Sequence, residues 1–371
     1  MENTSIFLSA GDPSGDTAAA RLVSALRELR PGFELVGLGG HKLRKLGQHQ
    51  LAEPEDLAVL GFWEVARHYF FFRRLFSRCI KQIKATRPSV VVLVDYPGFN
   101  LRLAKEIKPL GIPVVYYISP QVWAWGSKRL DDIRHLVDAM LLILPFEEAF
   151  YQNSGVRHGF VGHYLLEDIP EKFVSSPAPD SSVPTLGLLP GSRPQEIKKM
   201  LPPMLEAAQS FNNKYSARAV VAGVSNKFDY RPYLNKYSDD NIEIVFDDSR
   251  SVIYNSSLVL TASGTATLET AIVGRPMVVI YKTGWLTYHI ARRLVRLDKI
   301  ALANLVLGDK VVPELIQRQA TPENMLSALG KYMDDEKYRA GVTEQLKRVP
   351  ALLGGKGASV RTAEVIAGYL D

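Results

Sequence analysis

Short apolar runs recur along the first half of the chain and alternate with stretches of helical periodicity. The apolar runs are of strand length, and their hydrophobicity is continuous rather than alternating. Continuous hydrophobicity is typical of strands buried on both faces, as in a parallel sheet. The strands predicted in this half are residues 5–10, 33–38, 89–95, 113–118 and 138–144, with helices such as 17–30 between them.

The alternation stops at residues 170–184 and then begins again. This stretch holds four prolines and four serines, which indicates a linker. Further strands are predicted at residues 185–189, 218–223, 242–246, 257–261 and 276–281.

The pattern therefore predicts an α/β protein with two Rossmann-like, doubly wound domains. We expect the first domain over residues 1–169 and the second over residues 185–330. Residues 331–371 are helical in pattern, and we expect them to pack back on the first domain or on a partner protomer.

The composition is that of a globular protein with enough material for two cores. The chain has 371 residues, 46% of them hydrophobic and 23% charged. The single cysteine, Cys79, excludes an intrachain disulfide framework and favours a reducing cytoplasm. We expect no signal peptide, and no apolar run approaches the roughly 18 residues of a membrane span.

The net charge of +6 favours anionic partners. Nucleic acid, anionic lipid and phosphorylated substrates all fit that description. A mildly basic surface without such a partner accounts for the charge equally well.

Ligands of doubly wound domains bind at the carboxyl ends of the strands, so the strand-to-helix turns are the places to search. The first turn, "LSAGDPSGDT", places Gly11, Ser14 and Gly15 where a backbone can approach a ligand closely. It matches neither the dinucleotide fingerprint nor the P-loop, so nicotinamide cofactors and ATP are not indicated. A tight turn with Ser14 or Asp16 as the helix N-cap is an equal alternative.

The turn "LLPGSRPQEI" opens the second domain. Arg193 stands there between a strand and a helix start, where a guanidinium can fork onto a phosphate. The alternative is a surface arginine on a capped turn. Phosphate is favoured, because a positive charge beside a helix N-terminus is unfavourable without an anion.

The stretch "ASGTATLE" follows a buried strand of the second domain. Ser263, Gly264 and Thr265 can direct N–H and hydroxyl donors at a diphosphate, and Glu269 suits the paired hydroxyls of a ribose. The combination predicts a grip for a nucleoside diphosphate. An ordinary helix start, with Glu269 favourable to the helix dipole, is the alternative.

Asp95 ends the most apolar strand of the first domain, in "VVVLVDYPGFN". A carboxylate at that position can take a proton from a hydroxyl. The alternative is an aspartate that hydrogen-bonds the turn formed by Pro97 and Gly98.

Residues 61–80, "GFWEVARHYFFFRRLFSRCI", combine aromatic and arginine side chains in a helical pattern. The aromatic residues cover too much of the circumference for one core-facing stripe. We favour contact with a membrane or with acyl chains over a helix buried on two sides or in a dimer interface. The residues predicted to make this contact are Phe62, Trp63, Tyr69, Phe70, Phe72, Arg73, Arg74 and Phe76.

Other chemistries find little support in the sequence. The seven histidines show no paired metal-ligand spacing, no Asp-x-Asp follows a strand, and no G-x-S-x-G occurs. We therefore expect no metal site and no cofactor, and we read His163 as a packed or hinge histidine.

Over nearly its whole length, the sequence resembles the lipid A disaccharide synthase family. The segments that carry the resemblance are "SAGDPSGD", "DLAVLGFWEV", "VDYPGFNLRLAK", "YYISPQVWAWGSKR", "LPFEEAFY", "FVGH", "LLPGSRPQEI", "ASGTATLE" and "LANLVLG". Several of these, notably "SPQVWAW" with "LPFE", are specific to the family, whereas the "ASGTATLE" type is shared more widely among nucleotide-sugar transferases with two Rossmann-like domains.

The resemblance implies the GT-B fold and a metal-independent, inverting glycosyl transfer. UDP-2,3-diacylglucosamine would be joined to 2,3-diacylglucosamine 1-phosphate, giving UDP and a β-1,6-linked disaccharide phosphate. It also implies a homodimer with exchanged C-terminal parts, peripheral on the inner face of the bacterial inner membrane, and no nucleic acid partner.

The resemblance carries three residue roles onto this chain. The essential aspartate of the family matches Asp95, the essential arginine matches Arg193, and the uridine-binding asparagine matches Asn304. Two positions depart from the family pattern. Asp12-Pro13 replaces the usual Glu-Ala of the first turn, and Gly98 replaces the second aspartate of "DAPDFN".

Two other functions fit the same residues. One is a soluble UDP-N-acetylglucosamine transferase or 2-epimerase on the same fold, which would have no use for residues 61–80. The other is a peripheral membrane protein that binds UDP-sugars without turnover.

Overall fold

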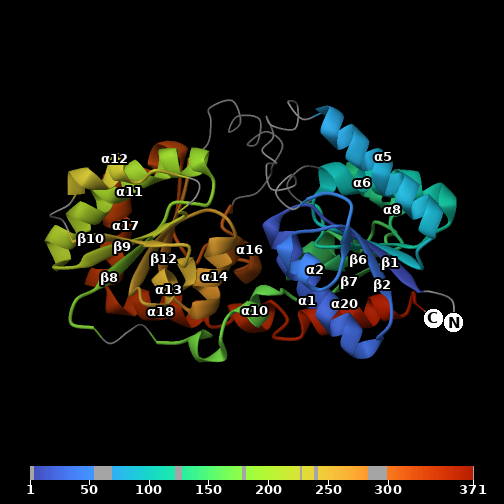
Figure 1. Ribbon diagram of the computed structural model, residues 1–371. Coiled ribbons are helices and arrows are strands. Elements are labelled where there is room, and N and C mark those ends of the chain that lie inside the picture. The colour runs from blue at the N-terminus through green and yellow to red at the C-terminus, as the bar shows by residue number, and fades with distance from the viewer. Residues whose placement is uncertain are drawn as a thin grey trace. The chain divides into compact units, whose positions relative to one another are not determined.

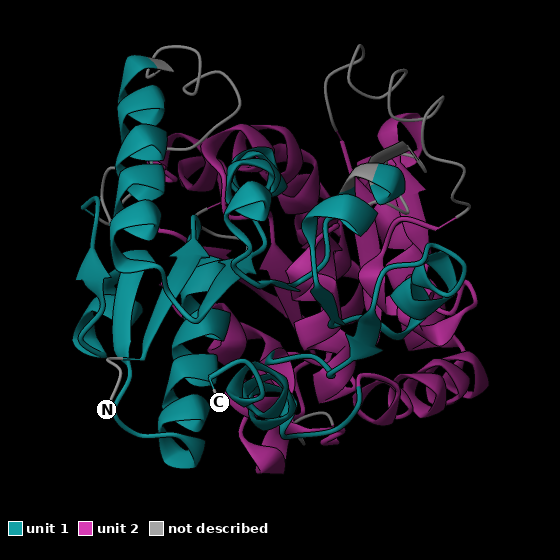
Figure 2. Ribbon diagram, turned by 90° about the vertical axis from the view of Figure 1, so that its right-hand side faces the viewer, with its two compact units in different colours: residues 1–164, 354–371 teal, residues 165–353 magenta. Residues whose placement is uncertain are grey.

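A computed structural model describes residues 4–53, 69–121, 128–177, 181–225, 228–237, 241–282 and 299–370. The chain divides into two compact units (Figure 2). Unit 1 comprises Met1–Tyr164 with Gly354–Asp371, and unit 2 comprises Leu165–Leu353. Each unit is a parallel sheet flanked by helices (Figure 1), which confirms the predicted α/β class and the two Rossmann-like folds.

Unit 1 holds a seven-stranded sheet in which every pairing is parallel, in the order β3-β2-β1-β4-β5-β6-β7. Its central strands are apolar and fully buried, as their continuous hydrophobicity predicted. The strands are β1 (Ser5–Ala10), β2 (Glu34–Leu38), β3 (His49–Gln50), β4 (Val90–Val94), β5 (Val114–Tyr117), β6 (Ala139–Leu142) and β7 (His158–Phe160).

Helices cover the sheet of unit 1. The last of them, α20, packs against α1, so the C-terminal end of the chain completes this unit. The helices are α1 (Pro13–Leu29), α2 (His41–Lys45), α5 (Tyr69–Thr86), α6 (Pro97–Ile107), α8 (Lys128–Leu136), α9 (Glu148–Tyr151) and α20 (Ala358–Ala367).

Unit 2 repeats the plan with six parallel strands in the order β10-β9-β8-β11-β12-β13. The strands are β8 (Thr185–Leu189), β9 (Arg218–Gly223), β10 (Ile242–Phe246), β11 (Leu258–Ala262), β12 (Met277–Tyr281) and β13 (Glu314–Ile316). The helices are α10 (Leu165–Asp168), α11 (Pro194–Tyr215), α12 (Arg231–Leu234), α13 (Ser249–Tyr254), α14 (Thr265–Val273), α16 (Leu302–Leu307), α17 (Pro322–Asp334), α18 (Glu336–Leu346) and α19 (Val349–Leu352).

The ten predicted strands are all present, each within one or two residues of its expected ends. Three edge strands, β3, β7 and β13, carry too short an apolar run to be recognised. The C-terminal helices divide between the units, α18 and α19 in unit 2 and α20 in unit 1. The stretch expected as a linker begins with a short helix, Glu171–Phe173, and continues along unit 2, where the Ser175 amide donates to the Ile272 carbonyl.

One buried side chain fastens the carboxyl ends of the two central strands of unit 1. The hydroxyl of Ser9 on β1 donates to Asn100 Oδ1 at 2.8 Å. Asn100 Nδ2 donates to the carbonyls of Val94 at 3.2 Å and Asp95 at 2.8 Å, at the end of β4. Asn100 has no exposed surface, so no water can replace these bonds. The amide therefore fixes the backbone from which Asp95 projects.

Replacing Asn100 with alanine should lower the free energy of unfolding by about 2–3 kcal/mol, because buried carbonyls lose their donor. Urea denaturation measures this change. Asn255, whose amide bonds at an exposed helix end, supplies the control: Asn255→Ala should stay within about 0.5 kcal/mol of the parent. Equal stability of the two variants would contradict the role given to Asn100.

Candidate active site

The topology of unit 1 brings two of the predicted turns together. Strand β1 pairs with β2 on one side and with β4 on the other, so the chain reverses its direction of winding between β1 and β4. Ala10 is in register with Val94, and the first turn and Asp95 follow these residues directly. This reversal point is where doubly wound sheets bind ligands.

Asp12 is the N-cap of α1, rather than Ser14 or Asp16, which were the alternatives from the sequence. Its carboxylate accepts from the Gly15 amide at 3.0 Å. A Cβ at Gly15 would collide with that carboxylate, and a Cβ at Gly11 would collide with the Tyr96 ring. Both glycines are therefore required by close approach. Ser14 is exposed beside them.

Asp16 has a structural role in unit 1. Its buried carboxylate accepts from the amides of Gly40 at 2.7 Å, Lys42 at 3.0 Å and Leu43 at 3.2 Å. These amides open α2, so Asp16 joins the start of α1 to the start of α2.

Asp95 combines backbone strain with a perturbed carboxyl group. Asp95 and Tyr96 both adopt left-handed backbone, with φ of 47° and 49°, which is costly for residues with a Cβ. The strain is held by the Asn100 amide and by the Tyr116 hydroxyl, which donates to the Asp95 carbonyl at 2.5 Å. Burial, and secondarily the negative charge of Asp12, raise the pKa of Asp95 to about 6.

Unit 2 has the same kind of reversal point between β8 and β11. Strand β8 pairs with β9 on one side and β11 on the other, with Leu189 in register with Thr261. Arg193 follows β8, and the 263–265 turn follows β11. Because these strands are parallel neighbours, both turns lie at the same edge of the sheet.

Arg193 is the N-cap of α11, and its side chain is 81% exposed. The guanidinium contacts Glu196 at 3.3 Å, within the first turn of the same helix. An exposed pair of this kind contributes little to stability. The guanidinium is therefore free to change partner when an anion arrives at the helix start.

The 263–265 turn is partly exposed. Gly264, the N-cap of α14, has φ 157° and ψ −161°, a conformation that glycine adopts readily. A Cβ at Gly264 would meet no heavy atom of the described residues within 4 Å. The Ser263 hydroxyl donates to the Ile300 carbonyl at 3.1 Å, and Thr265 is exposed at the first position of α14. The start of this nine-residue helix is thus accessible to an anion.

Glu269 belongs to a charge cluster that the sequence did not reveal. Arg250 on α13 donates from Nε to Glu269 at 3.2 Å and from Nη2 to Asp168 at 3.0 Å. Burial raises the pKa of Glu269, and Arg250 offsets part of the rise. No spacing along the chain links residues 168, 250 and 269, so only the fold could reveal the cluster.

Asn304 is completely buried on α16 and uses both ends of its amide within unit 2. Its Oδ1 accepts from the amides of Val311 and Val312, both at 3.0 Å. Its Nδ2 donates to the Val312 carbonyl at 2.9 Å and to Glu314 at 2.8 Å. Glu314 also accepts from the amides of Ile300 and Ala301, each at 3.0 Å, at the start of α16. In this structure Asn304 orders a loop, and its contact with a uracil stays a prediction.

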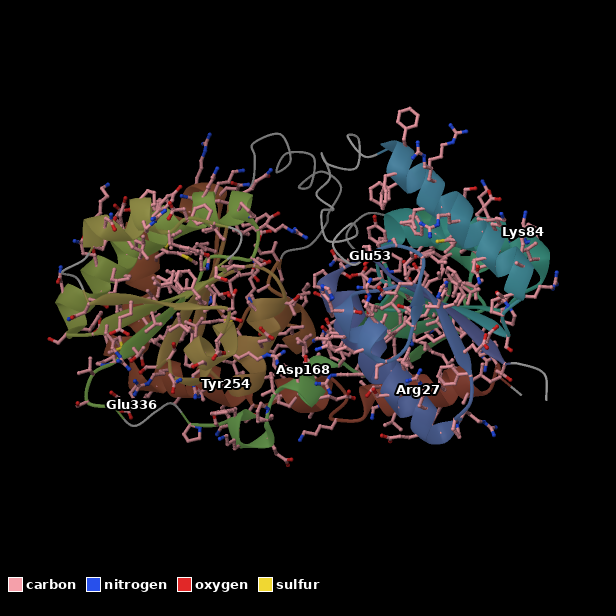
Figure 3. All side chains as sticks on the ribbon, viewed as in Figure 1. Arg27, Glu53, Lys84, Asp168, Tyr254 and Glu336 are labelled. Atoms are coloured by element: carbon pink, nitrogen blue, oxygen red, sulfur yellow. The ribbon has the colours of Figure 1, made fainter. Side chains whose placement is uncertain are left out.

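Helix α5 contains the described part of residues 61–80. Phe70 is 71% exposed and Arg73 and Arg74 are exposed, whereas Phe72 and Phe76 pack against the core of unit 1. Phe62, Trp63 and the side chain of Tyr69 lie outside the described residues. The helix therefore combines a core-facing side with an exposed basic side, and Lys84 lies on its last turn (Figure 3).

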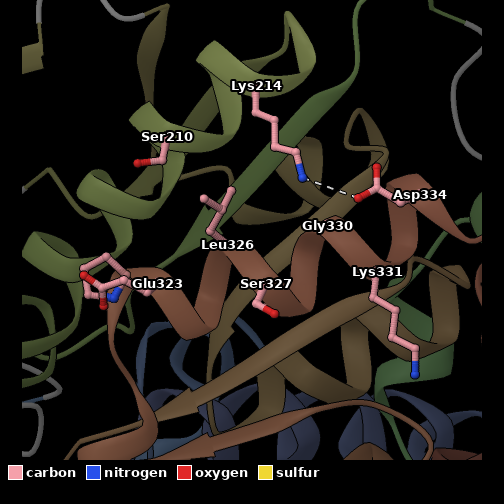
Figure 4. A pocket seen from close by; sticks show the side chains of 9 residues that line it. Ser210, Lys214, Glu323, Leu326, Ser327, Gly330, Lys331 and Asp334 are labelled. Atoms are coloured by element: carbon pink, nitrogen blue, oxygen red, sulfur yellow. Dashed lines mark hydrogen bonds and ion pairs between the residues drawn. The ribbon is translucent and has the colours of Figure 1, made fainter.

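A groove of about 580 Å³ lies between α11 and α17 (Figure 4). Its charged side chains include Lys214, which pairs with Asp334 at 3.4 Å. Lys214 is in the last turn of α11, whereas Arg193 caps the first turn. A helix of 22 residues spans about 33 Å, so this groove is remote from the candidate site.

The described residues contain no group of three or more His, Cys, Asp or Glu residues arranged to hold a metal ion. None of the helices in the described ranges is long and apolar enough to span a membrane. Metal independence stays a prediction.

Comparison with known families gives a match over nearly the whole chain. The model of the family described as lipid-A-disaccharide synthetase matches residues 6–360. A lipid-A-disaccharide synthase of Anaeromyxobacter dehalogenans (strain 2CP-C) is 40% identical, covering 98% of this chain and 97% of that protein. One from Nitrosococcus oceani is 39% identical, covering 100% and 98%.

Solved structures show the same two-sheet arrangement. The Staphylococcus aureus MnaA–UDP co-structure superposes with a TM-score of 0.65 at 13% identity, covering 98% of this chain and 95% of that one. The spinosyn rhamnosyltransferase SpnG gives 0.61 at 16% identity, covering 98% and 99%. At these identities the likeness concerns the fold alone, which is GT-B. From the family match and this fold together, it follows that the chain belongs to the lipid-A-disaccharide synthase family and is a GT-B glycosyltransferase of lipid A biosynthesis.

Proposed function

We propose that the chain transfers 2,3-diacylglucosamine from UDP to the 6-hydroxyl of 2,3-diacylglucosamine 1-phosphate, with inversion. The observation that carries the proposal is the place of Asp95: a half-buried carboxyl group on strained backbone at the reversal point of unit 1, with its pKa raised to about 6. A general base works best when its pKa lies near the operating pH.

In the proposed reaction, unit 2 holds the donor. The 263–265 turn and Arg193 bind the diphosphate, Glu269 binds the ribose, and Asn304 lies on the uracil side. Support comes from the parallel neighbours β8 and β11, which deliver two of these groups to one sheet edge. The accessible start of α14 supplies N–H donors.

The proposed chemical step is a single displacement. The acceptor 6-oxygen attacks the anomeric carbon on the face opposite UDP, while the Asp95 carboxylate takes the hydroxyl proton. The bond from the anomeric carbon to the diphosphate oxygen breaks, and UDP leaves with the electron pair. Arg193 and the α14 amides stabilise the negative charge on the departing diphosphate.

We also propose that the protein lies at the cytoplasmic face of the inner membrane and binds it through α5. The exposed side of α5 carries Phe70, and the helix contains no acidic residue. Acyl substrates make such contact advantageous, because moving each CH₂ from an apolar phase into water costs about 0.8 kcal/mol.

The homodimer implied by the family resemblance is part of the proposal, and sedimentation equilibrium tests it: a monomer at micromolar concentration would remove the homodimer from the proposal.

The substrate proposal is tested by release of UDP in detergent micelles. We expect release from UDP-2,3-diacylglucosamine in the presence of the acylated acceptor, with a disaccharide product. UDP-N-acetylglucosamine is the matched donor, with an acetyl group in place of long acyl chains. Release from that donor alone would remove the lipid substrate from the proposal and keep the nucleotide site, whereas binding of UDP without turnover would make the protein a non-catalytic binder.

Asp95→Asn should lower kcat/KM by about 10²- to 10⁴-fold, because the base is lost, while UDP binding is retained.

In the parent protein, activity should fall as the pH drops through about 6, since a raised pKa leaves Asp95 protonated below that value. Asp12→Asn keeps an N-cap residue but removes a charge that raises the pKa of Asp95. The acidic limb of the pH–activity profile of Asp12→Asn should therefore lie at lower pH than that of the parent. An unmoved limb would show that another group controls it.

Replacing Arg73 and Arg74 together with glutamine should weaken binding to phosphatidylglycerol vesicles by about tenfold or more, since each surface cation contributes about 1 kcal/mol. Vesicle sedimentation at low salt measures this. The control is Lys198→Gln with Lys199→Gln, two exposed lysines of unit 2. Equal losses in both pairs would mean that net charge, and not α5, determines binding.

A further inference from the structure

Arg250 joins two largely buried carboxylates of unit 2. Asp168 has a side chain 7% exposed, Glu269 is 15% exposed, and Arg250 between them is 35% exposed. Three partly desolvated charges are costly unless they form ion pairs and hydrogen bonds with one another. None of the predicted roles includes Arg250 or Asp168.

Glu269 needs the arginine in order to accept hydrogen bonds. Burial favours the protonated carboxyl, and a protonated carboxyl loses part of its capacity to accept from two hydroxyls. Arg250 opposes this effect and contacts only Oε1 through Nε. Lone pairs of the ionised carboxylate remain for the vicinal hydroxyls of a ribose.

Asp168 holds the guanidinium from its other side. Arg250 Nη2 donates to the Asp168 carboxylate at 3.0 Å, and Nη1 donates to the Asp168 carbonyl at 3.3 Å. Figure 3 labels Asp168 on α10, and Tyr254 at the end of α13. With three donors of the guanidinium engaged, its plane is fixed relative to Glu269.

The segment that carries Asp168 is itself fastened to unit 2. Phe173 stacks on Tyr254 with ring centroids 3.8 Å apart. Arg275, which is buried, donates to the Ser176 carbonyl at 2.7 Å and to its hydroxyl at 3.2 Å. Asp168 therefore has a rigid support, and the Arg250 geometry is set before any ligand binds.

We propose that Arg250 is a positioning residue for the nucleotide: it keeps Glu269 ionised and oriented toward the ribose hydroxyls, and Asp168 fixes Arg250. The inference rests on the proposed function, which assigns the ribose to Glu269. The charged and titratable groups acting around Glu269 are Arg250, Asp168 and Tyr254.

The test is calorimetric titration of the full chain with UDP and with 2′,3′-dideoxy-UDP, which lacks the hydroxyls. Arg250→Gln should weaken UDP binding about tenfold and binding of the dideoxy compound less than twofold. Because loss of Arg250 raises the pKa of Glu269 further, the UDP affinity of this variant should increase with pH more than that of the parent. Asp168→Asn should show a smaller effect of the same kind.

Arg218→Gln is the matched control, since Arg218 lies at the opposite end of the strands, at the start of β9. It should bind both ligands as the parent does. Arg250→Lys, which keeps the charge without the fork, should retain part of the preference for UDP and provides a second variant if the glutamine variant is unstable.

Three outcomes decide the matter, with thermal melting used to verify folding. Equal weakening of both ligands by Arg250→Gln, or none, would overturn the inference and leave Arg250 a structural ion pair. Retention of the ribose preference in Glu269→Gln would instead overturn the ribose assignment of the proposed function. Loss of that preference in Glu269→Gln but not in Arg250→Gln would overturn the inference alone.

Discussion

The site depends on one constraint. In each unit, the first strand pairs in parallel with the strand that follows the reversal of winding. In unit 1 this pair is β1 with β4, and in unit 2 it is β8 with β11. Each pairing leaves two strand-to-helix turns at one edge, with no helix crossing between them. Residues separated by about 70 to 85 positions thereby become neighbours, and the Asn100 amide shows how firmly such an edge is fixed in unit 1.

Two carboxylates of the candidate site illustrate how different environments divide the chemistry. Asp95 is half-buried beside another acid, Asp12, and the consequence is a pKa raised to about 6, suited to taking up a proton. Glu269 is buried beside a cation, Arg250, which favours its ionised form and suits it to accepting hydrogen bonds. The same side-chain chemistry therefore supports two roles, and the neighbours decide which one each carboxylate has.

Helix α5 shows why an aromatic and basic segment was hard to interpret from its sequence. Leu75, Cys79 and Ile83 form the buried side, and Phe72 and Phe76 extend that contact. Phe70, Arg73 and Arg74 lie on the exposed side. One side of this helix is thus a core side and the other an exposed basic side, and a one-dimensional pattern cannot separate the two when aromatic residues occur on both.

The sequence alone was enough to predict the parallel α/β class, the ten main strands and the turns proposed to bind ligands, because continuous apolar runs and small residues after strands act locally. It also identified Asp95, Arg193 and the 263–265 turn as candidates. Only the tertiary structure decided which residue caps α1, where the buried amides of Asn100 and Asn304 bond, and that Glu269 has Arg250 and Asp168 as partners. These features depend on burial and on contacts between distant segments, which have no period or spacing along the chain.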